Sequence, residues 1–415
     1  MTSDPTLDDR VPSRTQVAIV GAGPAGLTLG HLLHLQGIGS VILERSSREH
    51  VEQRLRAGII EQPSVDLLVS AGLGDRLLRA GMVHSGFYLR YDDSTHYLDF
   101  HPHTGQHATV YGQHELVKDL IAARIGTRRP LLFDTEVTAI SPTGPTASVR
   151  YRTAAGEHTL EADFVVGADG FHGAGRAAIP AEVRGELIRE YPVAWLGILA
   201  ESTPAAPEGM YCPHPNGLSV HSMRGPKLSR QYLQVPAGTE LGDWSDEQIW
   251  DELSLRCSAA DAAPLETGPI IERSLAPLRS YVSSTMQYDR LFLAGDAAHI
   301  VPPTGAKGLN LAISDTCVLS HALGAALNHG STEHLERYTA TALPRVMAAQ
   351  RFSALLTTTL HALPGDGFTE ALRRATLDRW VGSQAAQHEL GEVYLGLPFA
   401  TAPTFGSPIG AGAPA

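Results

Sequence analysis

The sequence predicts an α/β fold in which a Rossmann-like domain is joined to a domain with a mixed β-sheet and to a helical C-terminal region. Three observations lead to this prediction. A strand, a glycine-rich turn, a helix and a second strand follow one another in residues 16–44. Two later apolar strands, in residues 164–170 and 290–296, each run into an aspartate. Between them, residues 218–235 have the pattern of a β-hairpin.

The composition is that of a globular chain longer than one ordinary domain. The 415 residues are 43% hydrophobic and 18% charged, with a formal net charge of -12, which disfavours nucleic acid and anionic lipid as partners. No apolar run reaches the roughly 18 residues of a membrane span, and residues 1–14 lack a signal-peptide pattern, so we expect a cytoplasmic protein. Cys212, Cys257 and Cys317 lie far apart without a CxxC spacing, so we expect neither a disulfide framework nor a metal site.

The first structured segment has the pattern of a dinucleotide-binding βαβ unit. Residues 16–20 are a short apolar run that leads directly into Gly21-Ala22-Gly23-Pro24-Ala25-Gly26. Residues 27–36 predict a helix, and residues 40–44 predict a second strand that ends at Glu44. The glycines permit a tight turn and a close approach of the backbone to a pyrophosphate, and the Glu44 carboxylate can accept hydrogen bonds from a ribose diol. This unit predicts a bound nucleotide and leaves NAD and FAD open.

Two later motifs narrow the choice of nucleotide. Residues 164–170 form a buried strand with an Asp-Gly turn, residues 290–299 form a strand that ends at Gly-Asp, and residues 302–310 lead into a helix. In this order the motifs resemble those of the class A FAD-dependent aromatic hydroxylase family. The resemblance extends from about residue 15 to about residue 398. Further runs that carry it are Leu43-Glu44-Arg45, Arg54-Leu55-Arg56-Ala57-Gly58, Tyr111-Gly112-Gln113, Asp169-Gly170-Phe171-His172-Gly173 and Val393-Tyr394-Leu395-Gly396-Leu397-Pro398.

The resemblance implies FAD as the bound cofactor. The carboxylate of Asp296 would hold the ribityl chain, and the helix that follows would point its N-terminus at the flavin pyrimidine ring. A positive helix end there stabilises the negative charge of reduced flavin. The expected FAD contacts are Gly21, Gly23, Ala25, Gly26, Glu44, Arg45, Arg54, Arg56, Gln113, Arg230, Asp296, Gly308, Leu309 and Asn310.

The predicted hairpin supplies a candidate binding site for a carboxylate. Two strand-like runs within residues 218–235 are joined by a Gly-Pro turn, and side chains two positions apart share one face of a strand. Ser222 therefore pairs with Arg224, and Arg230 pairs with Tyr232. The residues alone fit a solvated sheet face as well as a pocket whose arginine forks and hydroxyls bind a carboxylate. The resemblance implies the pocket, with Arg224 as the main partner, Ser222 and Tyr232 assisting and Arg230 nearer the flavin.

The resemblance also implies a phenol at the other end of the substrate. Tyr211 and Tyr394 match the tyrosine pair that binds the substrate hydroxyl and relays its proton outward, and His84 matches the histidine at the solvent end of that relay. The backbone carbonyl of Pro303 would orient the hydroxyl, and Asn310 would complete the catalytic set. A phenol with a free pKa of ~10 needs such a base relay and a positive field to ionise at neutral pH.

The implied activity is hydroxylation of 4-hydroxybenzoate beside its hydroxyl group, giving 3,4-dihydroxybenzoate and water. NADH or NADPH would reduce FAD, and O2 would add to the reduced flavin as a C4a-hydroperoxide whose distal oxygen passes to the ring. A homodimer is expected. The alternatives are the same chemistry on 4-aminobenzoate or 3-hydroxybenzoate, an NAD-linked dehydrogenase, and a non-catalytic FAD-binding or redox-sensing protein.

The choice between the two nicotinamide coenzymes depends on a short segment. Residues 45–52 predict a helix start with Ser46 as its N-cap. In the resembling family this helix lies over the 2′-phosphate of NADPH, where Ser46 and His50 now replace a glutamine and a tyrosine. Glu52 adds a negative charge that Arg48 could offset, so we expect a preference for NADH. The expected coenzyme contacts are Arg45, Ser46, His50, Arg56, His172 and Arg279.

The domain boundaries expected from these motifs make two of the domains discontinuous. The expected divisions are a disordered N-terminal extension (1–14), an FAD-binding domain (15–84, 107–185 and 280–331), a substrate-binding β-sheet domain (85–106 and 186–279), a helical dimerisation region (332–398) and a flexible tail (399–415).

Overall fold

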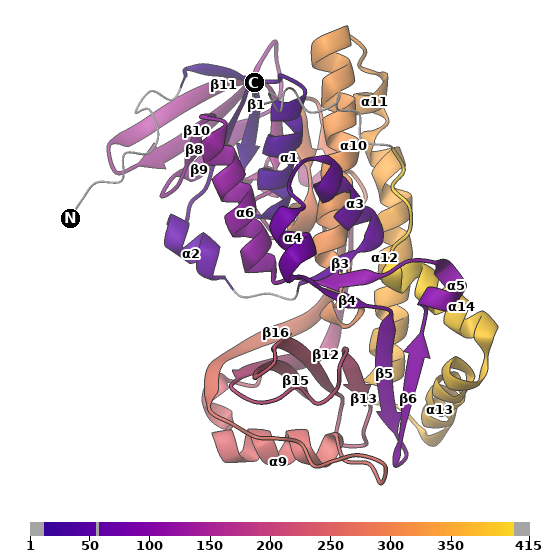
Figure 1. Cartoon of the computed structure of the whole chain (residues 1–415). Helices are drawn as coiled ribbons and strands as arrows, with labels where there is room; N and C mark the ends of the chain where they lie inside the picture. The colour runs from indigo at the N-terminus through magenta and orange to yellow at the C-terminus, as the bar shows by residue number, and fades with distance from the viewer. Residues whose placement is uncertain (1–11, 55–57, 402–415) are drawn as a thin grey trace, which may run out of the picture.

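The computed structural model describes residues 12–54 and 58–401. Figure 1 shows an upper part, in which helices cover a β-sheet, and a lower part built on a second sheet. The long helices α10 (Gly308–His329) and α12 (Tyr338–Leu360) run along one side of the molecule, and α12 reaches both parts. The two parts are therefore joined by continuous secondary structure as well as by loops.

The upper sheet is an α/β sheet of eight strands in the order β17-β18-β11-β1-β2-β8, and β9 and β10 branch from β11. The strands are β1 (Arg14–Val20), β2 (Ser40–Leu43), β8 (Leu131–Leu132), β9 (Glu136–Ser141), β10 (Ala147–Thr153), β11 (Gly156–Gly167), β17 (Gln287–Tyr288) and β18 (Leu291–Leu293). β1 pairs in parallel with β2 and β11, and β11 pairs in parallel with β18. The carboxyl ends of these strands share one edge, where nucleotides bind in open α/β sheets.

Three helices lie over this sheet: α1 (Pro24–Leu35), α6 (Gln113–Gly126) and α10. Helix α1 packs between the other two. Helix α1 begins directly after the glycine-rich turn because Pro24 fits the first helical position. Residues Val17 to Val20 of β1 are buried, as expected of a continuous apolar strand in a parallel sheet. The predicted βαβ unit is therefore confirmed.

The lower sheet is mixed, with the order β19-β16-β12-β15-β14-β13-β5-β6 and a parallel pairing between β13 and β5. Its strands are β5 (Gly86–Tyr91), β6 (Ser94–Asp99), β12 (Glu186–Ala200), β13 (Met210–Cys212), β14 (Ser219–Gly225), β15 (Leu228–Pro236), β16 (Ile270–Ser283) and β19 (His299–Ile300). Helix α9 (Asp246–Arg256) packs on one face through Ile249 and Leu253. The predicted hairpin is confirmed as β14 and β15.

A small sheet lies between the two parts in Figure 1, and four short helices occur in the same stretch of the chain. The sheet has the order β3-β7-β4, with β3 (Ile59–Glu61), β7 (Ala108–Val110) and β4 (Met82–His84). The helices are α2 (Arg48–Gln53), α3 (Gln62–Ser70), α4 (Asp75–Ala80) and α5 (His101–Thr104). Short helical turns elsewhere are α7 (Ala174–Ala177), α8 (Ala181–Arg184), η1 (Leu241–Asp243), η2 (Gly295–Ala297) and η3 (Pro303–Gly305).

The C-terminal region is helical, as predicted, with α11 (Glu333–Glu336), α12, α13 (Gly367–Gly382) and α14 (Gln384–Leu395). The first half of α12 packs into the upper core through Tyr338 and Ala342. Its second half packs into the core of the lower sheet through Phe352, Leu356 and Leu360. Because one helix belongs to both cores, the two sheets hold a fixed relation to each other.

Two expected boundaries differ from the structure. The N-terminal extension was expected to reach residue 14, whereas Arg14 begins β1, pairs with Glu161 in the sheet and forms an ion pair with Asp163 at 2.8 Å. The expected boundary at residue 279 cuts through β16, because that strand is still paired with β12 as far as Ser283. Both differences arise from strand pairing with distant segments.

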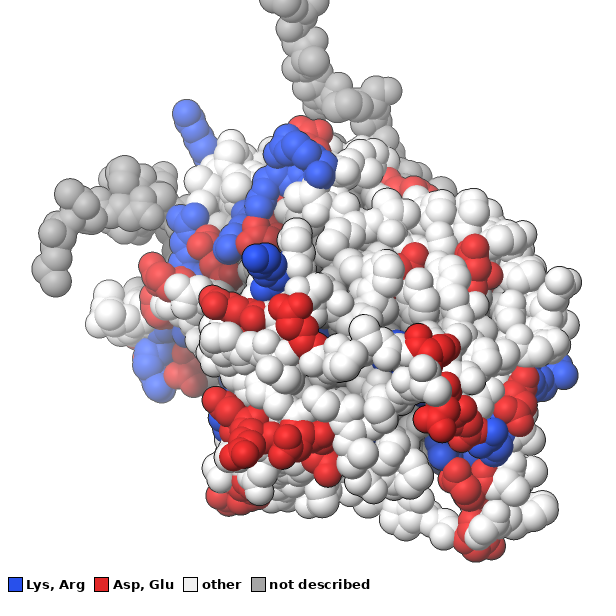
Figure 2. All heavy atoms as spheres, turned by 60° about the horizontal axis from the view of Figure 1, so that its bottom comes forward, with Lys and Arg blue, Asp and Glu red and all other residues white. Residues whose placement is uncertain are grey.

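Acidic side chains predominate on the face that the lower part presents in Figure 2, in keeping with the net charge of -12. A polyanion would meet repulsion there. In the part of the chain that the structure describes, no helix is both long enough and apolar enough to cross a membrane.

Candidate functional site

The glycine-rich turn after β1 leaves room for a nucleotide. Gly21 has a φ of +104°, and a Cβ there would lie 2.3 Å from the carbonyl oxygen of Ala168. A Cβ on Gly26 would lie 2.0 Å from the oxygen of Gly21, so this glycine is needed for close packing of helix and strand. A Cβ on Gly23 would meet nothing within 4 Å. The turn therefore packs tightly at its two ends and is open at its centre, beside the N-terminus of α1, where a pyrophosphate fits.

Glu44 is held at the end of β2 by two backbone amides. Its Oε2 accepts a hydrogen bond from Ala22 N at 2.8 Å, and its Oε1 accepts one from Ser46 N at 2.9 Å. A carboxylate has about four lone-pair sites, so two remain for the hydroxyl groups of a ribose. This arrangement fits the expected role of Glu44.

The second half of the candidate cofactor site follows β18. Asp296 lies in η2, directly after Gly295, whose amide donates to Asp315 Oδ2 at 2.8 Å. The same oxygen lies 2.7 Å from His299 Nε2, and both side chains are buried. The negative charge of Asp315 raises the pKa of His299 against the effect of burial. This buried pair ties the backbone of η2, which contains Asp296, to Asp315 of α10.

The first turn of α10 is tied to β3. Gly308 and Leu309 open the helix, and the buried Asn310 donates from Nδ2 to the carbonyl of Ile59 at 3.0 Å. Its Oδ1 accepts from the amide of Glu61 at 2.9 Å. The amide side chain expected to take part in catalysis is thus used to join α10 to β3.

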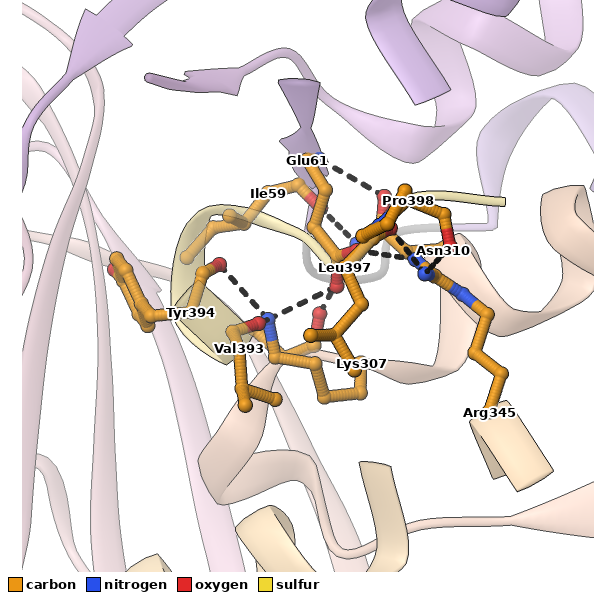
Figure 3. Close-up of polar contacts among 10 residues, drawn as sticks. Ile59, Glu61, Lys307, Asn310, Arg345, Val393, Tyr394, Leu397 and Pro398 are labelled. Carbon is orange, nitrogen blue, oxygen red and sulfur yellow. Dashed lines mark hydrogen bonds and ion pairs between the residues drawn. The ribbon is translucent and has the colours of Figure 1, made fainter. Parts of the chain in front are cut away.

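A buried ionic cluster lies beside this turn, and sequence reasoning missed it (Figure 3). Lys307, which precedes α10, pairs with Glu61 at 2.9 Å and donates to the carbonyls of Val393 and Tyr394 at 2.7 and 2.8 Å. Burial lowers the pKa of Lys307, and the Glu61 carboxylate opposes that shift. Lys307 is one of only three lysines in the sequence, which is the one signal that could have singled it out.

Arg345 of α12 completes the cluster. It pairs with Glu61 Oε2 at 2.8 Å and donates to the carbonyl of Pro398 at 3.1 Å and to that of Leu397. Phe399 lies over its guanidinium at 5.0 Å. The first described residues of the expected tail are therefore packed, and residues 402–415 lie outside the described structure.

The arginines of the hairpin have different partners. Arg230 pairs with Glu272 at 3.2 Å and donates to Ser274 Oγ at 2.8 Å. The hydrogen bond that the structure gives Arg224 goes to the carbonyl of its neighbour Met223 at 2.8 Å, and burial lowers the pKa of Arg224. Arg230 thus has a carboxylate, whereas the described ion pairs give none to Arg224. A partly buried guanidinium of this kind favours an anionic ligand.

Ser222 lies two residues before Arg224 on β14, and Tyr232 lies on the neighbouring strand β15. Ser222 lies opposite Arg230 and donates to its carbonyl at 3.0 Å, and Val220 lies opposite Tyr232. The Tyr232 ring packs against Trp195 with centroids 4.8 Å apart. An electrostatic interaction with Tyr232 opposes the lowering of the Arg224 pKa by burial, and the charge of Arg230 adds to that lowering. The three residues expected to bind a carboxylate therefore lie on one hairpin, and Tyr232 is near enough to Arg224 to act on its charge.

The two tyrosines of the expected relay lie in different elements and share one neighbour. Tyr211 in β13 and Tyr394 in α14 are buried, and both contact Phe87 with ring centroids 5.1 and 5.2 Å away. Tyr211 donates to the carbonyl of Thr304 at 2.9 Å, one residue beyond the expected Pro303. Burial raises the pKa of both phenols, so both are neutral at pH 7.

His84 lies at the end of β4 and is 2% exposed. Burial lowers its pKa, an effect that Glu208 opposes and Arg224 reinforces. Its Nε2 has no hydrogen-bond partner among the described residues. Sequence reasoning missed Glu208, which accepts from Tyr97 at 2.9 Å and from the amides that follow His84. A neutral imidazole in this position can accept a proton.

The coenzyme segment forms a helix with a different cap from the expected one. The N-cap of α2 is Ser47, whose hydroxyl accepts from His50 N at 3.2 Å, because Ser46 is already bound through its amide to Glu44. Arg48 and Glu52 form an ion pair at 2.7 Å. The prediction of Ser46 as the cap was therefore wrong by one residue.

The other expected nucleotide contacts are spread around the same region. Arg279 lies over the ring of Phe171 at 4.4 Å, and His172 packs edge-on against that ring at 4.9 Å. Arg54 follows α2, and Gln113 begins α6. Ala25 and Leu309 lie in the first turns of α1 and α10, and Arg45 lies between β2 and α2. Arg56 lies outside the described residues.

Comparisons with known proteins agree with this architecture. Among solved structures, p-nitrophenol 4-monooxygenase from Pseudomonas putida is 18% identical with a TM-score of 0.79, over 92% of this chain and 99% of that one. A probable FAD-dependent monooxygenase from Pseudomonas aeruginosa is 23% identical with a TM-score of 0.74, over 88% of this chain and 99% of that one. These likenesses establish the fold.

The sequence comparisons are more specific. The model of a family described as an FAD binding domain matches residues 14–353. The p-hydroxybenzoate hydroxylase of Acinetobacter baylyi is 42% identical over 388 residues, which cover 93% of this chain and 96% of the relative. A 3-(3-hydroxy-phenyl)propionate/3-hydroxycinnamic acid hydroxylase of Paraburkholderia xenovorans is 26% identical, over 78% of this chain and 52% of the relative. The chain therefore belongs to the FAD binding domain family, within the class A FAD-dependent aromatic hydroxylases.

Proposed function

We propose that this protein hydroxylates 4-hydroxybenzoate beside its hydroxyl group to give 3,4-dihydroxybenzoate, using FAD, a nicotinamide coenzyme and O2. The observation that carries the proposal is Arg224, a partly buried guanidinium whose described hydrogen bond goes only to its neighbouring carbonyl. The name of the 42% identical relative supports the same substrate.

FAD fits the residues at the edge of the upper sheet. The open space at Gly23 and the N-terminus of α1 would receive the pyrophosphate, Glu44 a ribose, and Asp296 with the N-terminus of α10 the flavin end. Once reduced, FAD supplies the activated oxygen, which protein side chains cannot provide. The protein must then bind the aromatic acid, keep water away and ionise the phenol.

The carboxylate of the substrate would bind at the hairpin. Arg224 offers two parallel N–H donors, and the hydroxyls of Ser222 and Tyr232 lie on the same two strands. The substrate carboxylate would replace the water that Arg224 lost on burial. The attraction between the two charges is stronger in this low-dielectric site than it would be in water. Arg230 is already paired with Glu272. Only the part of its positive charge that Glu272 does not offset would act on the cofactor.

The phenol would lose its proton through Tyr211. The Tyr211 hydroxyl donates to Thr304, so its oxygen is free to accept from the substrate hydroxyl. For this the Tyr211 hydroxyl would turn from Thr304 and give its own proton to Tyr394, which would pass its proton on towards His84. The lowered pKa of His84 keeps the imidazole neutral and able to accept a proton at neutral pH. The resulting phenolate makes the neighbouring ring carbon nucleophilic, and the positive charge of Arg224 stabilises the bound anion.

A substrate panel tests the function. The purified protein should be yellow and should consume O2 and coenzyme rapidly only with 4-hydroxybenzoate, with 3,4-dihydroxybenzoate as the identified product. Equal or greater turnover of 4-aminobenzoate or 3-hydroxybenzoate would replace the proposed substrate. Turnover of an alcohol without O2 would indicate a dehydrogenase, and absence of any turnover would indicate a non-catalytic FAD protein.

We also propose a cytoplasmic homodimer with an FAD-binding domain around the upper sheet and a substrate domain around the lower one. Exposed apolar side chains on α12 and α13 support an interface: Met347 is 43%, Phe368 71% and Leu372 55% exposed. Light scattering at several protein concentrations measures the oligomeric state, and a monomer at all of them would exclude the homodimer.

We expect His84→Asn to slow hydroxylation by less than the roughly 100-fold that a direct acid–base partner typically contributes. The imidazole acts at the end of the relay, and water can partly replace it. Because the pKa of His84 is lowered, its neutral form persists at neutral pH and is lost as the pH falls through that lowered value. The acidic limb of the hydroxylation rate should therefore shift in His84→Asn. An unchanged profile would remove His84 from the relay.

We expect NADH to be preferred over NADPH. The ion pair of Arg48 with Glu52 occupies the one arginine within α2, and a 2′-phosphate would meet the Glu52 charge. Steady-state kinetics with both coenzymes test this. A kcat/KM for NADPH at least about tenfold above that for NADH would contradict the preference, since tenfold corresponds to roughly 1.4 kcal/mol.

A matched pair of variants locates the preference. Glu52→Gln removes a negative charge and the ion pair of Glu52 with Arg48, so the ratio of kcat/KM for NADPH to that for NADH should rise. Glu49→Gln removes the same charge from the same helix and leaves the Arg48 ion pair in place. Equal effects of the two substitutions would mean that net charge alone, and not the ion pair of Arg48 with Glu52, sets the preference.

A further inference from the structure

Three residues that are distant in the sequence meet in the lower part of the molecule. Cys212 ends β13, His221 lies in β14, and Cys257 caps the C-terminus of α9. Their exposed fractions are 0%, 2% and 4%. One ligand atom of each lies within 4.8 Å of the other two. Two sulfurs and an imidazole nitrogen are thus collected in one buried place.

We propose that Cys212, His221 and Cys257 form a binding site for one thiophilic metal ion, Cu⁺. Bond lengths to a thiophilic ion such as zinc are about 2.3 Å for sulfur and about 2.0–2.1 Å for nitrogen. Three ligand atoms spaced evenly around one ion at these bond lengths are therefore about 4 Å apart. The observed limit of 4.8 Å is close to that separation, so small side-chain rotations bring the three atoms onto one centre.

The imidazole is arranged as metal-binding histidines usually are. His221 Nε2 lies 3.0 Å from Ser219 Oγ, and its Nδ1 is buried without a hydrogen-bond partner among the described residues. A histidine ligand commonly donates its second ring N–H to a neighbouring oxygen, which fixes the tautomer and frees the other nitrogen. Ser219 would have this positioning role, and Nδ1 would bind the ion.

The charges around the sulfurs favour a monovalent ion. Arg90 Nη1 donates to the carbonyl of Cys257 at 2.7 Å and lies 3.2 Å from its Sγ, while its Nε donates to Thr95. Two thiolates carry two negative charges, of which Arg90 offsets one and Cu⁺ would offset the other. Thiolates select both Cu⁺ and Zn²⁺, but structural zinc almost always has four ligands, and the described residues bring three together here.

An occupied site would join three elements next to the relay. Cys212 follows Tyr211 directly in β13, and His221 pairs with Met210 of the same strand. Helix α9 would be attached to this strand through Cys257. The inference does not depend on the proposed substrate, because it rests on ligands that do not take part in the proposed reaction.

Metal binding to the intact FAD-containing protein tests the inference. Protein purified with a thiol-free reductant and dialysed against excess chelator is offered Cu⁺ without oxygen, or Zn²⁺ in a parallel arm, and is then desalted. We expect one retained copper per chain and an X-ray absorption spectrum with two sulfur ligands and one nitrogen ligand. We also expect a copper-dependent rise in Tm, since an ion that binds only the folded state stabilises it.

Single substitutions identify the ligands. Cys212→Ser, Cys257→Ser and His221→Gln should each weaken Cu⁺ binding by more than about 100-fold, and Ser219→Ala by about 10- to 100-fold. Cys317→Ser is the matched control, because Cys317 is also buried but lies in α10, outside the cluster. It should retain wild-type binding. If the ligand variants fail to retain FAD, the X-ray absorption spectrum and the copper-dependent Tm shift of the wild-type protein decide whether the site binds Cu⁺.

Several results would overturn the inference. They are no retained copper, equal loss of copper in Cys317→Ser and the ligand variants, or a copper spectrum without sulfur. A Cys212–Cys257 disulfide that resists the reductant would make the pair a covalent link instead. Zn²⁺ that displaces Cu⁺ would overturn the assignment of a monovalent ion.

Discussion

Arg224→Ala is expected to lower kcat/KM for 4-hydroxybenzoate about 30- to 1000-fold, mainly through KM, while FAD stays bound. The loss of a charge-assisted, two-point contact with the substrate carboxylate costs roughly 2–4 kcal/mol. FAD should remain because its expected contacts, apart from Arg230 of the hairpin, lie at the edge of the upper sheet. Substrate titration with flavin absorbance measures both quantities in one sample.

Thermal unfolding separates a binding role of Arg224 from a structural one. Burial lowers the pKa of Arg224, so its charge costs folding stability in the absence of substrate. Arg224→Ala should therefore keep or raise the Tm without substrate and should lose the increase in Tm that 4-hydroxybenzoate gives the wild type. Lys227→Ala removes an exposed cation from the turn of the same hairpin and should change neither property. An unchanged KM in Arg224→Ala would exclude the proposed carboxylate site.

Tyr211→Phe is expected to retain substrate binding but to lose about 100-fold or more of the hydroxylation rate, with coenzyme oxidation diverted to hydrogen peroxide. The substitution removes the oxygen that would accept the substrate proton and leaves Arg224 intact. Product formed and peroxide released per coenzyme oxidised are the measurements. A wild-type ratio of product to coenzyme would mean that another group ionises the phenol.

Tyr338→Phe is a matched control for the loss of a buried tyrosine hydroxyl. Tyr338 is buried and donates to the carbonyl of Leu293 at 2.8 Å, as Tyr211 does to Thr304 at 2.9 Å. Each substitution should cost about 1 kcal/mol of unfolding free energy through the lost hydrogen bond. Only Tyr211→Phe should uncouple coenzyme oxidation from hydroxylation, so stability and catalysis are separated.

Local backbone chemistry made several elements predictable from the sequence. The turn from Gly21 to Gly26 was predictable because the positive φ at Gly21 and the close packing at Gly26 both require glycine. The β14–β15 hairpin follows from two strand-like runs and a Gly-Pro turn between them. The N-cap of α2 was misplaced by one residue because two adjacent serines have equal intrinsic preference. The hydrogen bond of Glu44 with the amide of Ser46 left Ser47 as the cap.

The sequence by itself determined the nucleotide-binding unit, the hairpin and the helical C-terminus, because each of these elements depends mainly on residues that are close together in the sequence. Only the tertiary structure decided which charges are paired. It joined Glu61 to Lys307 and Arg345, gave Arg230 a carboxylate and left Arg224 with its neighbour's carbonyl. It also brought Cys212 and Cys257 together. These contacts join residues far apart in the chain, and side-chain type and spacing carry no information about which distant partners packing will supply.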